Sequence, residues 1–416
     1  MRGVILVPEP GVWRDDRAPG GLRLLERQLK QLRAVGVGSV VLLVPEGHPV
    51  PQLPVQIAAA EICRVPTGAR GLLAAVCAAV DDLPDEFVFL SADRLVDLRI
   101  LRALVEGVGS IVVRRAHGAA VEPIGRSTAL DVRRFGRDLA SHATTLCLGD
   151  IDLYVAELRG NAAPYVLTAH SPEEREIAWR VLLDHAQKRR LDLPGRYFDG
   201  PFENFLVRRL APTAMTPNQV TLLTMALAAV VGILFFHGWL RAGIVLALAV
   251  GVLDGVDGKL ARLKLATSKL GELEHVGDFF YENLWYLALG RWLQGATGES
   301  ALWSAALALV TLDLSDSLLY LVVRARTGVM LDELSSFDTA FRQIAGRRNV
   351  YVMLFAVGFF SGYPARAFVI ALAWAGVTVA VHAVRVGWTL VATGRRARGS
   401  PASSSGTATR ALVSDR

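Results

Sequence analysis

Long apolar runs fill the second half of this 416-residue chain, and they restrict its fold more than any other feature. A membrane-spanning helix needs about 20 consecutive apolar residues, and six segments from Asn218 onward approach that length. Their bounds lie close to 218–236, 240–260, 271–293, 301–323, 350–361 and 368–391. We therefore predict an all-α transmembrane domain of six helices over residues 218–392, with the fifth helix the shortest.

Three clusters of basic residues flank these apolar segments, all on the same side. They gather after the second, fourth and sixth segments, at 262–269, 324–348 and 395–398. Because cytoplasmic loops are rich in Lys and Arg, we expect a protein integral to the cell membrane with both termini cytoplasmic. The Ser- and Gly-rich residues 393–416 are predicted to form a disordered cytoplasmic tail. The net charge of +6 is modest, and no basic stripe is interleaved with aromatic residues. We therefore predict no nucleic-acid partner.

The first 190 residues alternate strand-like and helix-like segments. GVILVP, SVVLLVPEG and EFVFLSAD are short apolar runs, whereas LRLLERQLKQLRAVGV has apolar residues at helical spacing. This order predicts parallel strands joined by crossover helices, which is an α/β sandwich domain over residues 1–190. Pro, Gly and Asp punctuate residues 191–217. We predict a linker there, with a helix that lies on the membrane surface and directs Phe202 and Phe205 toward lipid.

Carboxylates interrupt the apolar runs where hydrocarbon should be. Asp254 and Asp257 are three residues apart, and Glu274 and Asp278 are four apart, so each pair shares one helical face. Charge inside a membrane is unfavourable, which makes a functional site the first interpretation. Clustered carboxylates require cations, and oxygen ligands favour magnesium, manganese or calcium. The alternative is that these acids cap helix ends and pair with nearby basic residues.

The stretch DGVDGKLAR resembles the signature of the CDP-alcohol phosphotransferases. That signature reads D-x-x-D-G-x-x-A-R, then eight residues, G, three residues, D, three residues and D. The positions that match are Asp254, Asp257, Gly258, Ala261, Arg262 and Gly271. TPNQVT, residues 216–221, is also similar to the start of the first span in that family. The resemblance covers residues 196–392 or so.

The resemblance implies an enzyme that moves a phosphoalcohol group, such as phosphatidyl or phosphoinositol, from a CDP-linked donor to a polar alcohol or alcohol phosphate. The alcohol attacks the β-phosphorus and CMP is released. It also implies Mg²⁺ or Mn²⁺ on the signature carboxylates, a lipid bilayer around the protein, and a homodimer. Contacts to the donor are implied for Asn218, Thr221, Gly258, Ala261, Arg262 and Gly271.

The sequence departs from the signature at its end. Strict counting from Gly271 places His275 and Phe279 where the last two aspartates belong, and Phe279 can serve neither as ligand nor as base. One residue earlier, Glu274 and Asp278 have the required spacing. We favour this shift, which makes both carboxylates metal ligands and Asp278 the general base. The alternatives are a site in which His275 is the base, or one that has lost its base.

Two adjacent arginines precede the fifth apolar segment, in AGRRN. Arg347 and Arg348 could hold a phosphate on the acceptor, because guanidinium groups bind phosphate with paired hydrogen bonds. They could equally anchor the chain at the cytoplasmic surface.

The N-terminal region resembles the sugar-phosphate nucleotidyltransferases, in GVILVP, LLERQLKQLRAVGV and FVFLSADRLVD. In that family an aspartate at a strand end binds magnesium, and Asp93 matches it. The glycine-rich loop is replaced by PEPGVWRDDRAPGG, where prolines lack N–H donors and Glu9 repels phosphate. We therefore favour a non-catalytic domain, whose removal should leave transfer intact. The alternatives are a bifunctional enzyme that also makes its CDP donor from CTP, and an inactive membrane scaffold.

Overall fold

The computed structural model describes residues 1–7, 19–50, 60–69, 71–266 and 270–399, and it leaves the side chains of 270–279 and 393–399 undescribed. The chain divides into two compact units. Unit 1 comprises Met1–Arg189, Leu206–Thr216 and Gly258–Thr267. Unit 2 comprises Arg190–Phe205, Pro217–Asp257 and Ser268–Arg416.

Unit 1 is built on a seven-stranded mixed sheet with the order β3-β2-β1-β4-β7-β6-β8. β1 lies parallel to β2 and β4, whereas β7 runs antiparallel to both of its neighbours. The strands are β1 (Arg2–Leu6), β2 (Val40–Pro45), β3 (Ala60–Val65), β4 (Glu86–Ser91), β6 (Ile111–Arg114), β7 (Val121–Thr128) and β8 (Thr144–Cys147). Unit 1 also has two separate two-stranded sheets, β5 (Arg94–Val96) with β11 (Val166–Thr168) and β9 (Tyr154–Val155) with β10 (Gly160–Asn161).

Helices cover both faces of this sheet, which is why its central strands are continuous apolar runs. Ile5 and Leu42 point into a core shared with α2 (Leu24–Ala34) and α4 (Leu98–Glu106). Their neighbours Val4 and Val41 point into the opposite core. That core is shared with α3 (Leu72–Ala78), α5 (Ala129–Phe135) and α6 (Leu139–His142). The predicted α/β sandwich is confirmed.

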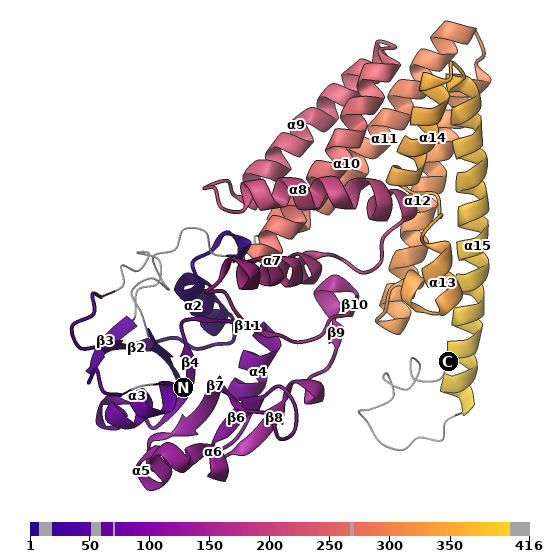
Figure 1. Ribbon diagram of the computed structural model, residues 1–416. Helices are drawn as coiled ribbons and strands as arrows, with labels where there is room; N and C mark the ends of the chain where they lie inside the picture. The colour runs from indigo at the N-terminus through magenta and orange to yellow at the C-terminus, as the bar shows by residue number, and fades with distance from the viewer. Residues whose placement is uncertain (8–18, 51–59, 70, 267–269, 400–416) are drawn as a thin grey trace. The chain divides into compact units, whose positions relative to one another are not determined.

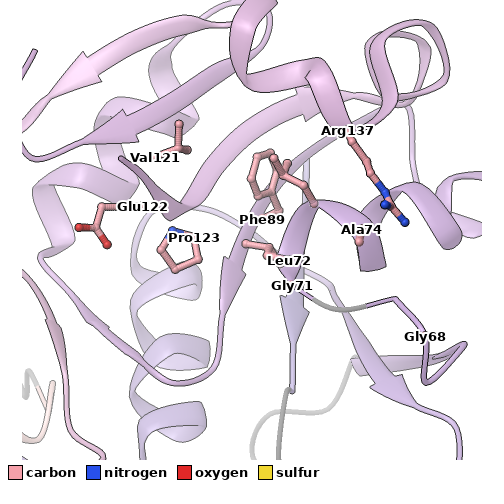
Figure 2. A pocket seen from close by; sticks show the side chains of 10 residues that line it. Gly68, Gly71, Leu72, Ala74, Phe89, Val121, Glu122, Pro123 and Arg137 are labelled. Atoms are coloured by element: carbon pink, nitrogen blue, oxygen red, sulfur yellow. The ribbon is translucent and has the colours of Figure 1, made fainter. Parts of the chain in front are cut away.

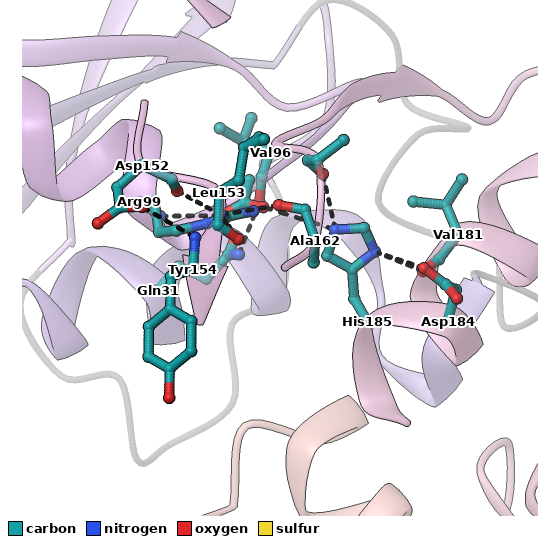
Figure 3. Close-up of polar contacts among 12 residues, drawn as sticks. Gln31, Val96, Arg99, Asp152, Leu153, Tyr154, Ala162, Val181, Asp184 and His185 are labelled. Carbon is teal, nitrogen blue, oxygen red and sulfur yellow. Dashed lines mark hydrogen bonds and ion pairs between the residues drawn. The ribbon is translucent and has the colours of Figure 1, made fainter. Parts of the chain in front are cut away.

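A cluster of polar contacts holds α4 and α7 (Pro172–Ala186) in unit 1 (Figure 3). Asp97 caps α4 by accepting the backbone N–H of Arg99 at 2.9 Å. The Arg99 guanidinium donates to the carbonyl oxygens of Asp152 at 2.8 Å and Ala162 at 2.9 Å. His185 of α7 places its two ring nitrogens 2.8 Å from the carbonyl oxygens of Val181 and Ala163. Asp97 is therefore a structural aspartate.

Unit 2 is helical (Figure 1). A π-helical turn (Gly195–Asp199) leads into α8 (Gly200–Leu210), whose last residues group with unit 1. The longer helices are α9 (Pro217–Phe236), α10 (Leu240–Leu263), α11 (Leu270–Thr297), α12 (Ala301–Thr327), α14 (Arg348–Phe360) and α15 (Pro364–Gly399), with the short α13 (Ser336–Phe341) between α12 and α14. Small residues allow close packing: a Cβ on Gly290 would overlap the Ala306 side chain, where α11 meets α12.

Three helices of the described chain are long and apolar enough to cross a membrane: α9, α12 and residues Pro364–Ala392 of α15. The expected all-α C-terminal region is thus confirmed, with three candidate membrane spans among the described residues. α10 and α11 are long enough but carry the acidic residues discussed above, and α14 has only 13 residues. The count of six spans remains a prediction.

Candidate functional site

The two signature aspartates of α10 occupy different surroundings. Asp257 is only 2% exposed, and its Oδ2 accepts a hydrogen bond from Thr221 Oγ1 of α9 at 2.8 Å. Thr221, expected to contact the donor, therefore lies directly beside a predicted metal ligand. This hydrogen bond fixes the rotamer of the carboxylate, as an ordered ligand requires.

Asp254 forms an ion pair with Arg348, at the start of α14. The same guanidinium donates to the Tyr281 hydroxyl and lies 3.2 Å from Oε1 of Glu282, both on α11. Arg348 is thus held by two carboxylates and connects α14 with α10 and α11, which are more than 50 residues away in sequence.

The linker adds acids that sequence analysis did not identify as part of a site. Asn349 Nδ2 lies 3.4 Å from Asp192 Oδ1 and 3.3 Å from Asp199 Oδ2. A Cβ on Gly255 would overlap the Glu203 carboxylate, so a larger residue between the signature aspartates would displace that side chain. The only signal in the sequence was the acidic composition of this segment, which is also typical of a helix N-terminus.

Asp199 is 4% exposed, and burial raises the pKa of its carboxyl to about 7, with Glu203 and Asp192 adding to the effect. A folded-state pKa above the unfolded value means that the folded protein binds the proton more tightly. Stability should therefore fall as pH rises from about 4 to about 7.

Replacing Asp199 by asparagine should remove this loss. Three pKa units correspond to at most about 4 kcal/mol, so the variant should melt higher than the parent at pH 8 and similarly at pH 4. Thermal unfolding in detergent with EDTA measures the difference. Asp81→Asn, at an exposed carboxylate of unit 1, is the control. An equal shift at both pH values would contradict the assignment.

A group of arginines lies at the start of α14. The Arg347 guanidinium lies over the Tyr320 ring, with its Cζ 5.6 Å from the ring centroid. It forms no hydrogen bond or ion pair with the described residues. Arg342 Nε lies 3.0 Å from Asp332 Oδ2, while its buried Nη1 lacks a hydrogen-bond partner in the described chain. Burial, with Arg347 next in importance, lowers the pKa of Arg342 to about 10. These spare N–H donors suit an anion.

Of the remaining signature positions, some lie in the described part of the chain and others have side chains outside it. Asn218 lies in the first turn of α9, and a Cβ on Gly258 would lie 3.4 Å from Arg262 Nη2. The backbone of α11 is helical at Gly271, Glu274, His275, Asp278 and Phe279, but the side chains of the last four lie outside the described part. Within that part, no three His, Cys, Asp or Glu side chains gather as a metal site. Asp254 and Asp257 supply suitable oxygen donors, and the remaining ligands stay a prediction.

The shifted alignment can be tested by paired variants on α11. If Asp278 is the base, Asp278→Asn should lower the transfer rate by about 10²–10⁴-fold, the usual contribution of a general base. His275→Gln should lower it by less than about tenfold. Single-turnover release of CMP from a ready-made donor measures both rates. The reverse ranking would assign the base to His275 and reject the shift.

In unit 1, Asp93 follows β4 at the carboxyl edge of the sheet. Its Oδ2 is 3.2 Å from His170 Nε2, while its buried Oδ1 has no hydrogen-bond partner in the described chain and lies 3.6 Å from Arg94 Nε. Gln28 fixes the turn by donating to the carbonyl oxygens of Ser91 and Arg94, both at 2.8 Å. An orphaned buried carboxylate oxygen fits a divalent cation.

A cavity of about 540 Å³ lies at the same edge of the sheet (Figure 2). Its walls include the start of α3, Phe89 of β4 and the first residues of β7, with Glu122 and Arg137 on opposite sides. Leu90 pairs with Ile124, so β7 begins beside the turn that holds Asp93. A Cβ on Gly68 or Gly71 would meet nothing within 4 Å, which leaves their backbone open to a ligand.

Comparison with known proteins agrees with the motif. Residues 214–391 match the family model described as CDP-alcohol phosphatidyltransferase, so the chain carries a domain of that family and is a transferase. The resemblance read from DGVDGKLAR is confirmed. The chain is 26% identical over 397 residues to the bifunctional IPC transferase and DIPP synthase of Rubrobacter xylanophilus, an alignment that covers 83% of this chain and 86% of that protein.

Two solved structures resemble different parts of the chain. One is the phosphatidylinositol phosphate synthase of Mycobacterium tuberculosis with CDP-DAG bound, at 18% identity and a TM-score of 0.36, covering 45% of this chain and 93% of that one. The other is the 2-C-methyl-D-erythritol 4-phosphate cytidylyltransferase of Thermus thermophilus, at 18% identity and a TM-score of 0.28, covering 44% of this chain and 98% of that one.

Proposed function

We propose that the chain is a bifunctional membrane enzyme. Unit 1 forms a CDP-linked alcohol from CTP and an alcohol phosphate, and unit 2 transfers the phosphoalcohol group to a second alcohol or alcohol phosphate. The observation that carries this proposal is the alignment across 83% of the chain with a relative named for two activities. It favours the bifunctional alternative over the non-catalytic domain expected from the altered loop, whose residues 8–18 lie outside the described part.

Asp93 is the group in unit 1 around which donor synthesis would occur. An oxygen of the alcohol phosphate attacks the α-phosphorus of CTP, the bond to the β-phosphate breaks, and pyrophosphate leaves. Asp93 would hold a magnesium ion, which when bound offsets the negative charge of the triphosphate. The neighbouring cavity, with Arg137 on one wall, has room for a nucleotide.

In unit 2 the hydroxyl oxygen of the acceptor attacks the β-phosphorus of the CDP-linked donor. The bond between that phosphorus and the bridging oxygen breaks, and CMP leaves. Asp278 takes the hydroxyl proton, with His275 as the alternative base. Asp254 and Asp257 would hold magnesium or manganese, whose charge stabilises the pyrophosphate in the transition state. Asn218, Thr221 and Arg262 are proposed donor contacts.

Arg347 is the better placed of the two adjacent arginines for an acceptor phosphate. Arg348 is neutralised by Asp254 and Glu282, whereas Arg347 forms no ion pair with described residues. Arg347→Met should raise the KM for a phosphorylated acceptor by about 10–100-fold, the equivalent of about 1.5–3 kcal/mol for a charged hydrogen bond, with kcat nearly unchanged. Arg326→Met, at an exposed residue, is the control. Equal effects of both variants would reject the role.

The site is expected to face the cytoplasm, because the basic residues lie on one side of the apolar helices. The homodimer implied by the family remains a prediction. CDP-inositol and CDP-diacylglycerol are the donors to compare first, since they represent the phosphoinositol and phosphatidyl alternatives.

Purified full-length protein in detergent provides the test. With magnesium, labelled CTP and a panel of alcohol phosphates, pyrophosphate should form together with a CDP-alcohol, and CMP should follow when the second acceptor is added. CMP release from a ready-made donor without CTP turnover would leave a transferase alone. If neither reaction occurs with any member of the panel, an inactive membrane scaffold is favoured.

A further inference from the structure

The carboxyl-terminal end of α10 has contacts that neither proposed reaction uses. From Gly258 onward its residues group with unit 1. The helix ends in a Schellman-type turn, in which the Ala266 N–H donates to the Ala261 carbonyl at 2.9 Å. Leu265 supplies the left-handed residue, with a φ of 50°, although this position normally favours glycine. Such a terminus needs support from its surroundings to persist.

Arg27 of α2 supplies part of that support. Its side chain is among the most buried charges in unit 1, at 3% exposed, and burial lowers the pKa of its guanidinium. Nη2 donates to the Leu263 carbonyl oxygen at 2.7 Å and lies 3.4 Å from the Gly20 carbonyl oxygen. No carboxylate in the described chain pairs with Arg27. A cation at the carbonyl end of a helix is favoured by the helix dipole.

The absence of a side chain at Gly20 leaves space for the Arg27 guanidinium. Gly20 has a φ of 78°, and a Cβ there would overlap Arg27 Nη2, so a glycine admits the guanidinium. Two side chains of the helix end itself, Arg262 and Lys264, also donate hydrogen bonds to the surrounding backbone. Arg262 Nε donates to the Ala186 carbonyl at 2.6 Å, at the end of α7, and Lys264 Nζ donates to the Thr213 and Met215 carbonyls at 2.8 and 2.7 Å.

We propose that Arg27 is a positioning residue for the transferase, acting through Arg262. The proposal rests on the proposed function, because Arg262 is the expected donor-phosphate contact of the signature. Leu263 follows Arg262 directly, so capping its carbonyl fixes the last turn and the direction from which the Arg262 side chain extends. Without the cap the last turn frays, and donor binding weakens before the chemistry does.

This inference revises the expectation that residues 1–190 are dispensable for transfer. Every group assigned to that reaction lies beyond residue 217, but the segment with Arg262 is held by Arg27, Ala186 and the 213–215 backbone. Unit 1 therefore holds the helix end that carries Arg262, whether or not it turns over CTP.

The test uses full-length Arg27→Met and Arg27→Lys with ready-made CDP-inositol or CDP-diacylglycerol, whichever the parent turns over. Arg27→Met should raise the KM for the donor by about tenfold or more with kcat within about twofold, and Arg27→Lys should recover part of this loss. CTP turnover and the thermal midpoint of unit 1 should stay near those of the parent. Arg23→Met, at the exposed residue that directly precedes α2, is the control and should leave the donor KM unchanged.

An unchanged donor KM in a folded Arg27→Met protein would overturn the proposal. So would a parallel loss of CTP turnover, or of the thermal midpoint, since that would show a structural role in unit 1. Failure of the parent to release CMP would instead reject the proposed function. Failure of CTP turnover alone would leave this test intact, because the donor is supplied.

Discussion

Asp254→Asn and Asp257→Asn are each expected to lower CMP release from a ready-made donor by about 10³-fold or more, which corresponds to about 4 kcal/mol of transition-state stabilisation. An amide lacks the negative charge that holds a divalent cation, while its shape is almost that of the carboxylate. Both variants should therefore fold. The measurement is a single-turnover assay in detergent across a magnesium titration.

The two variants should differ in how they fail. Asp257 is buried and accepts a hydrogen bond from Thr221, and its amide variant should lose magnesium dependence. Asp254→Asn also removes one of the two carboxylates that pair with Arg348, while Glu282 remains. Glu299→Gln, at an exposed residue between α11 and α12, is the control. Wild-type rates in either aspartate variant at saturating magnesium would refute the metal site.

The sequence predicted the fold class because the hydrophobic pattern directly reports burial. Val4, Ile5, Val41 and Leu42 alternate between two buried faces, and a continuous apolar strand is the only pattern that satisfies both. The number of spans is a harder problem. Acidic residues in α10 and α11 lower hydropathy in the helices expected to carry the site, so composition alone cannot separate a functional span from a peripheral helix.

The candidate site was predictable only where residues are close along the chain. Asp254 and Asp257 share one helix, but the partner of Asp254 is Arg348, 94 residues away, and Asp199 meets Asn349 across 150 residues. Such pairings follow from tertiary packing and leave no local pattern. Arg347 and Arg348 are equivalent in sequence, yet adjacent residues at a helix start point in different directions, and only one is neutralised.

Asp93→Asn should abolish donor synthesis and spare transfer. Pyrophosphate formation from CTP is expected to fall by about 10²-fold or more, because the buried Oδ1 of Asp93, which has no hydrogen-bond partner in the described chain, is the proposed cation ligand. Transfer from a supplied CDP donor should remain within about twofold of the parent. Both rates can be measured on one preparation.

Asp97→Asn is the matched control for that variant, since Asp97 lies four residues further along and is engaged by the α4 N-terminus and Arg99. It should destabilise the protein by about 1–3 kcal/mol through the lost ion pair, while the folded fraction still turns over CTP. If Asp93→Asn kept normal CTP turnover, the cation site would have to lie elsewhere. If Asp97→Asn lost turnover while folded and Asp93→Asn did not, Asp97 would become the candidate ligand, despite its two hydrogen bonds to Arg99.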